Sequence, residues 1–217
     1  MKRRKFVVGL GSLAAGAGTA MGTGAFSGQS SKRKFYIASK GDADAFTKLK
    51  KVTSWPHSAE YTYYDGGHLV VDIPRLNSDS KWYFKKLFKL GANLTKNDGK
   101  HKYWIKNKYS QYCKDNGGTH YDGKQRVRWF CTSIYNGNDN KKRDCDDDYI
   151  HIPKPSGGKK KIGVEWLSGG DYLKLSPGDY CAVGVCINTR GLNVDDWKDK
   201  EPILKKAYVQ AKAADHE

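Results

Sequence analysis

Apolar side chains recur at every second position along much of the chain, and this period limits the fold more than any other feature. It is clearest in residues 180–188. In an extended strand, one face would carry Cys181, Val183, Val185 and Ile187, and the other face Ala182, Gly184 and Cys186. The other five runs with strong β propensity are residues 69–73, 82–90, 100–105, 127–135 and 161–167. Six strands with turn signals between them predict an all-β fold, a jelly-roll-like antiparallel β-sandwich with long loop insertions.

Two of these runs lie on either side of a polar turn at residues 96–99, and they are predicted to pair as a hairpin. In the run before the turn, Phe84 and Phe88 share one face of the strand, and Leu87 lies on the other.

The chain divides into a signal peptide, a short N-terminal segment at residues 26–40 and a single sandwich domain at residues 41–217. Within the domain, residues 107–126 and 136–160 have little apolar period and are predicted to be loops or an insertion. Residues 202–213 fit either a helical stripe or a strand, and propensity alone favours the helix.

The signal peptide is predicted at residues 1–25. A basic head at residues 2–5 precedes an uncharged stretch at residues 6–21 and a small-residue cleavage site that ends at Ala25. Both the general secretory and the twin-arginine route fit this pattern, and an uncleaved anchor is the alternative. We expect a secreted or cell-surface protein with no stable membrane span after cleavage.

The chain is strongly basic, with 39 Lys and Arg against 23 Asp and Glu and a formal net charge of +16. The predicted signal peptide carries four of the positive charges, which leaves +12 on the mature chain. Outside the cell this charge attracts acidic polysaccharides, phosphate-rich envelopes or released nucleic acid, and the attraction weakens with salt. Solubility alone is the alternative explanation.

Aromatic side chains are interleaved with cations in three places, and rings on a sheet face can stack on sugars or bases while the cations hold an anionic backbone. The candidate contacts to an anionic polymer or glycan are Lys81, Trp82, Tyr83, Lys102, Trp104, Arg126, Arg128 and Trp129. The alternative is a half-buried strand whose rings fill the core and whose lysines protect a sheet edge.

Five cysteines in an exported chain indicate disulfide chemistry. Cys113, Cys131 and Cys145 can supply one bridge that ties the long loops to the strand at residues 127–135. The two later cysteines face opposite sides of one strand and cannot bond to each other. Because five is odd, at least one thiol is free or joins another chain. A zinc site is the competing use of the cysteines.

No group of residues indicates catalysis. The six histidines are scattered, and none forms a His-Glu-x-x-His pair. The chain also lacks a Gly-x-Ser-x-Gly elbow and a phosphate-binding glycine loop. Four aspartates within residues 144–148 lack the glycine and the distal glutamate of a calcium loop, so a solvated loop is favoured. We therefore expect a protein that is not an enzyme and has no catalytic residue, no metal site and no cofactor.

Several motifs, taken in order, resemble those of secreted archaeal surface proteins related to TasA and camelysin. Residues 9–16 and 22–27, which end in Gly-Ala-Phe-Ser, resemble the export signal of that family. Further matches are residues 41–46, 67–73, 76–93, 175–179 and 183–192. The resemblance spans the chain from the signal to the C-terminus, and it favours a final strand over a helix after residue 205.

The resemblance implies a secreted structural β-sandwich and, in some relatives, a subunit of extracellular filaments. In such filaments a strand near the mature N-terminus is inserted into the sheet of the next subunit, where it satisfies unpaired backbone groups. Residues 34–39 are the predicted donor, with Phe35 and Ile37 on one face and Tyr36 and Ala38 on the other. Pairing of this segment within its own subunit is the alternative.

The chain departs from the relatives in its basic charge and in its five cysteines. Camelysin relatives are sometimes classed as peptidases, but no residue here carries that role by motif. We expect a cell-surface or matrix structural protein that self-associates into a homopolymer. The alternative is a binding module for an anionic extracellular polymer, either polysaccharide or nucleic acid, and a camelysin-type peptidase is the third candidate.

Overall fold

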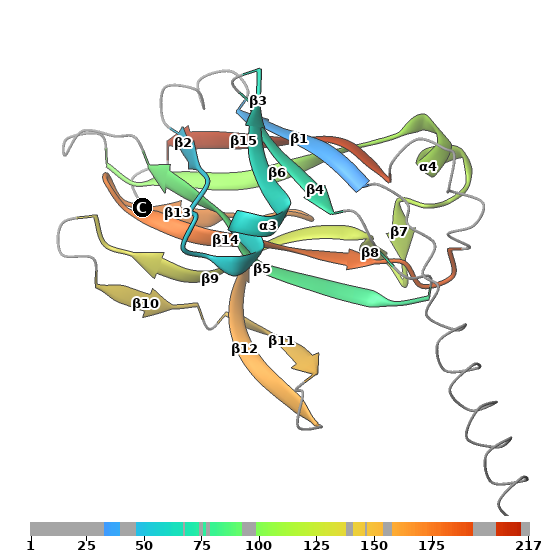
Figure 1. Ribbon diagram of the computed structural model, residues 1–217. Helices are drawn as coiled ribbons and strands as arrows, with labels where there is room; N and C mark the ends of the chain where they lie inside the picture. The colour runs from blue at the N-terminus through green and yellow to red at the C-terminus, as the bar shows by residue number, and fades with distance from the viewer. Residues whose placement is uncertain are drawn as a thin grey trace, which may run out of the picture.

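The computed structural model describes residues 33–39, 47–66, 68–73, 76, 79–92, 99–137, 141–145, 147–153, 158–192 and 203–213 (Figure 1). The predicted signal peptide at residues 1–25 and the turn at residues 96–98 lie outside these ranges.

Two main sheets account for most of the described residues. The first has the order β13-β6-β15-β1-β4-β3. Its strands are β13 (Leu173–Leu175), β6 (His101–Tyr109), β15 (Leu204–Ala213), β1 (Arg33–Ser39), β4 (His68–Ile73) and β3 (Thr62–Asp65).

The second sheet has the order β11-β12-β9-β14-β5-β2, and β10 pairs with β9 beside this path. Its strands are β11 (Asp148–Pro153), β12 (Lys159–Trp166), β9 (Val127–Tyr135), β14 (Tyr180–Asn188), β5 (Lys81–Ala92), β2 (Thr47–Lys50) and β10 (Lys142–Asp144). A small ladder joins β7 (His120–Tyr121) to β8 (Lys124–Gln125), and the helices are α3 (Pro56–Tyr61) and α4 (Gln111–Asp115).

The predicted all-β antiparallel sandwich is confirmed. Figure 1 shows β1, β15 and β4 in one layer and β9, β14 and β5 in the other. The alternate side chains of β14 that include Val183 and Val185 are fully buried, and they belong to one large apolar cluster with Val71 of β4, Tyr103 of β6 and Trp129 of β9. This cluster is the core that the two-residue period predicted.

The predicted hairpin is wrong. β5 pairs with β14 and β2 in the second sheet, whereas β6 pairs with β15 and β13 in the first. Consecutive strands of a sandwich can belong to different sheets. Alternation along a strand and a turn signal after it do not reveal which sheet receives the next strand.

The predicted position of Leu87 on the face opposite Phe88 is also wrong, because β5 contains an irregularity. The pairing with β14 shifts between Val183, which lies opposite Phe88, and Val185, which lies opposite Phe84. Lys86 has φ 55° in the inserted stretch, and Leu87 and Phe88 both enter the core. A bulge of this kind re-aims the side chains that follow it.

Residues 204–213 form a strand and not the helix that propensity favoured. β15 pairs with β6 along most of its length and with β1 on its other side. Buried Ala207 and Val209 pack in the core from this position. Sheet pairing on both sides outweighs a difference in propensity that is small per residue.

The two predicted loop segments contain short regular elements. Residues 107–126 include the end of β6, α4 and the β7–β8 ladder, and the Ser110 side chain caps α4 by accepting a 3.1 Å hydrogen bond from the Cys113 amide. Residues 136–160 include β10 and β11. Figure 1 shows β11 and β12 as a hairpin that reaches away from the two layers.

Among the described residues, we find no helix with the length and apolar character needed to cross a bilayer.

Candidate anion-binding pocket

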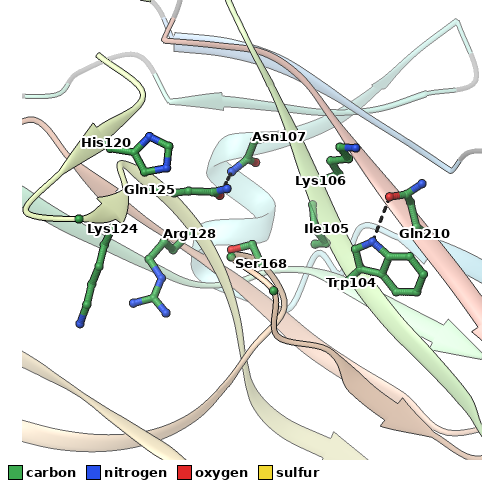
Figure 2. Close-up of a pocket in the computed structure, with 13 residues that line it drawn as sticks. Trp104, Ile105, Lys106, Asn107, His120, Lys124, Gln125, Arg128, Ser168 and Gln210 are labelled. Atoms are coloured by element: carbon green, nitrogen blue, oxygen red, sulfur yellow. Dashed lines mark hydrogen bonds between the residues drawn. The ribbon is translucent and has the colours of Figure 1, made fainter. Parts of the chain in front are cut away.

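A cavity of about 690 Å³ opens where β6, β8, β9 and β15 meet the turn at residues 168–170. We call it the amide pocket, because three carboxamide side chains line it: Asn107, Gln125 and Gln210. Figure 2 shows Trp104 and Gln210 at one side of the pocket and His120 and Lys124 at the opposite side. The volume lies within the range of small-ligand sites.

Asn107 is held by the core beneath the pocket. Its Oδ1 accepts a 2.8 Å hydrogen bond from the indole N–H of Trp129, which is fully buried. Its Nδ2 donates to the Val127 carbonyl at 2.7 Å and to Gln125 Oε1 at 3.0 Å. Because both ends of the Asn107 amide are fixed, Gln125 is oriented as well, with its oxygen occupied and its NH₂ group left as a donor at the pocket wall.

Trp104 and Gln210 are direct neighbours in the β6–β15 pairing. The indole N–H of Trp104 donates a 3.0 Å hydrogen bond to Gln210 Oε1, which fixes both half-buried side chains (Figure 2). A fixed indole beside a carboxamide gives the pocket an aromatic surface and a polar group together, which suits a sugar ring or a base.

The charge of the pocket is positive. Lys106, Lys124, Arg128 and His120 line it, and no Asp or Glu is among its described lining residues. The Arg128 guanidinium lies 3.5 Å from the centre of the Trp166 ring. Its ion pair with half-exposed Asp171 is long, at 3.9 Å, so this carboxylate offsets little of the positive charge.

The structure brings together two of the eight residues predicted to contact an anionic polymer, Trp104 and Arg128. Trp129 is fully buried in the core. Arg126 is 5% exposed and donates to the carbonyls of Asn188 and Arg190, so it supports the turn after β14, and burial lowers its pKa. The remaining four do not line the pocket: Lys81, Trp82, Tyr83 and Lys102.

Sequence reasoning missed most of the pocket. Its further lining residues include Lys106, Asn107, His120, Lys124, Gln125, Ser168 and Gln210. They come from separate elements, and none belongs to a motif. The cluster of Lys and Asn in residues 106–108 was the local signal available.

β1, the predicted donor strand, lies inside the first sheet of its own chain. It pairs antiparallel with β4 from Arg33 to Ile37 and parallel with β15 from Tyr36 to Ser39. Ile37 is 1% exposed and belongs to the core. The side chains of Phe35, Tyr36 and Ala38 lie outside the described part of the structure.

The three cysteines predicted to supply a bridge are all buried, and two of them are close together. The sulfur atoms of Cys131 and Cys145 are 3.1 Å apart, and Cys181 also lies within hydrogen-bonding reach of Cys131. Cys113 belongs to α4, beside Tyr109 and Arg126. None of the five cysteines, all of which lie in the described ranges, forms a disulfide in the structure. Burial raises the pKa of Cys131, and a hydrogen bond to Cys131 together with burial raises that of Cys145.

Neither a family model, nor a curated protein, nor a solved structure matches this chain. The resemblance to TasA and camelysin relatives therefore stays a prediction. Within the described ranges, no group of three or more His, Cys, Asp or Glu side chains is arranged to hold a metal ion.

Proposed function

We propose that this protein is an exported structural component of a cell surface or extracellular matrix, and that it binds an anionic polymer through the amide pocket. The observation that carries the proposal is the lining itself: four cationic or basic side chains, three carboxamides and one indole, with no carboxylate among the described lining residues. The charge of the whole chain, +16, acts in the same direction at longer range.

Each part of the lining has a separate task. Lys106, Lys124 and Arg128 attract the sulfate, carboxylate or phosphate groups of the polymer. The carboxamides donate hydrogen bonds to hydroxyl groups or base edges, and Trp104 stacks on a sugar ring or a base. Because the amide groups are already oriented, little side-chain freedom is lost on binding.

Binding of the mature protein to a sulfated polysaccharide, a single-stranded DNA and a neutral glucan tests this function. The variant Lys106→Gln/Lys124→Gln removes two lining charges, and Lys100→Gln/Lys114→Gln removes two exposed charges elsewhere. We expect the first pair to weaken binding of an anionic polymer about tenfold more than the second. Equal losses in the two double variants would contradict a role for the pocket, and the stronger of the two anionic ligands identifies the polymer class.

Self-assembly by exchange of β1 is the second candidate function. In the structure β1 pairs within its own chain, which is the alternative to donation, but its removal would leave a slot in the sheet with unpaired backbone groups on both sides. An identical strand from a second copy satisfies the same groups. A homopolymer forms when each copy donates its strand to the next.

A mixing experiment distinguishes exchange from pairing within one chain. Tyr36 and Lys206 are opposite each other in the β1–β15 register. One batch carries Tyr36→Cys and the other Lys206→Cys, and the two are mixed and oxidised. Exchange predicts a disulfide between the two variants, whereas Lys212→Cys, farther along β15, serves as the unmatched control. A mixture in which only unlinked chains remain contradicts exchange.

A further inference from the structure

A second cavity, of about 360 Å³, lies between β5, β9, β10 and β12. We call it the lysine pocket. Five lysines line it, Lys85 and Lys86 on β5, Lys142 on β10, and Lys160 and Lys161 on β12, and the only lining carboxylate among the described residues is Asp144. None of these lysines was a candidate in the sequence, because three strands distant along the chain bring them together.

The lysine charges are not balanced within the described structure. Lys142 and Asp144 form a 2.5 Å ion pair, which accounts for the one carboxylate. Lys85 and Lys160 have no ion pair with any described residue. Lys161 lies 3.5 Å from the centre of the Tyr149 ring, a contact that orients the ammonium group without neutralising it.

The lysines from two strands affect each other. Burial, then the positive charge of Lys160, then that of Lys86 lower the pKa of Lys85. A cluster of cations held close together in a concave site attracts an anion that relieves their repulsion.

Thr132 gives an independent indication of a ligand. This residue lines the lysine pocket and is 7% exposed, and its hydroxyl group has no hydrogen-bond partner in the described structure. A buried hydroxyl without a partner is costly and uncommon in folded proteins. An anion oxygen in the pocket would accept its hydrogen bond.

The backbone of β5 also points to a functional constraint. Lys86 adopts φ 55°, a left-handed conformation that a residue with a side chain adopts rarely. Glycine would adopt it without strain, yet the position holds a lysine that lines the pocket and whose ammonium group lies 5.7 Å from the centre of the Trp55 ring.

From this cavity, its unbalanced lysines and the unpartnered Thr132 hydroxyl, we propose that the lysine pocket binds a tetrahedral oxyanion, the phosphate or sulfate group of an extracellular ligand. Lys85, Lys86 and Lys160 supply the charge, and Thr132 donates a hydrogen bond. The proposal does not depend on the amide pocket, because the two cavities share no lining residue.

Thermal unfolding of the mature protein with sodium pyrophosphate or sodium sulfate, at constant ionic strength, tests the proposal. We expect at least one of these anions to raise the Tm by about 5 °C at saturation. Lys85→Gln/Lys160→Gln should weaken binding about tenfold or more, and Lys100→Gln/Lys114→Gln, which removes two exposed charges outside both pockets, should leave it unchanged. The more protective anion shows whether phosphate or sulfate is the recognised group.

Thr132→Val separates binding from folding, since it removes the hydroxyl and keeps the shape. We expect an affinity about threefold to tenfold lower, with no fall in the Tm of the protein without anion. The proposal is overturned if neither anion protects the native protein. It is overturned equally if Lys85→Gln/Lys160→Gln binds the anion as tightly as the matched Lys100→Gln/Lys114→Gln variant.

Discussion

The amide pocket and the lysine pocket are both basic, yet they differ in how their side chains are held. In the amide pocket, hydrogen bonds from Trp129 to Asn107 and from Asn107 to Gln125 connect the lining to the core. In the lysine pocket, five lysines line the cavity, and the buried Thr132 hydroxyl has no hydrogen-bond partner in the described structure. We therefore expect the first pocket to recognise shape and hydrogen-bonding groups, and the second to hold concentrated negative charge.

The largest expected effect is on the stability of the region beside the lysine pocket, and it comes from a disulfide between Cys131 and Cys145. Cys145 follows β10, whose Lys142 and Asp144 lie at the lysine pocket, and its sulfur is 3.1 Å from that of Cys131. Exchange with a low-molecular-weight disulfide during folding would join these sulfurs and release two thiols. We expect the bridge to stabilise the protein by about 3 kcal/mol, the value for a closed loop of about 15 residues.

Mass spectrometry of a non-reduced digest and urea unfolding with and without reductant measure this bridge. Cys113→Ala is the control, and the sensitivity to reductant should persist in it. A disulfide-linked Cys131–Cys181 peptide in place of Cys131–Cys145, or a stability that does not depend on reductant, would contradict a bridge that links the end of β10 to β9.

A smaller effect is expected from two substitutions on β9. Trp129→Phe leaves a cavity and deprives Asn107 of its indole donor, so we expect a loss of about 2 kcal/mol in the free energy of unfolding and weaker binding in the amide pocket. Thr132→Val, beneath the lysine pocket, should change stability by less than about 0.5 kcal/mol. Urea unfolding of both variants measures the two free energies. Similar losses of stability would mean that the amide pocket is no more closely connected to the core than the lysine pocket is.

The smallest effect concerns the pH dependence of stability. The pKa of Lys85 is lowered from its ordinary value of 10.5, so between its folded pKa and 10.5 the unfolded chain binds more protons there than the folded chain. Stability contributed by this site therefore rises as the pH increases through that window. Lys85→Met should remove this rise and change stability at neutral pH by no more than about 0.5 kcal/mol. Unfolding curves at several pH values measure the slope of stability against pH, with Lys100→Met as the control. A slope of opposite sign would show that the neighbours of Lys85 stabilise its charged form.

The sequence was informative about strands and less informative about their partners. The runs at residues 127–135 and 180–188 coincide with β9 and β14, because alternating side chains must separate core from surface. The same alternation could not place β5 and β6 in different sheets, since it describes one strand at a time. The bulge at Lys86 places Leu87 in the core, where strict alternation predicted the opposite face of the strand. No glycine marks this bulge in the sequence.

The pockets were hardly accessible from the sequence. Trp104 and Arg128 were found because aromatic and cationic residues alternate around them. Lys106, Ser168 and Gln210 carry no motif, and they meet because β15 pairs with β6 and a turn packs against β9. β10 and β12 both pair with β9 and bring lysines to the lysine pocket. The sequence predicted only a loop or an insertion for residues 136–160, which contain β10.

The salt dependence of polymer binding tests the central claim most directly. Affinity for the preferred anionic polymer is measured from low to physiological salt for the native protein, for Lys106→Gln/Lys124→Gln and for Lys100→Gln/Lys114→Gln. If the amide pocket holds the polymer, the slope of log affinity against log salt should fall by about two units in the first variant and stay near the native value in the second. Identical slopes in all three proteins would contradict the claim that this pocket binds the polymer.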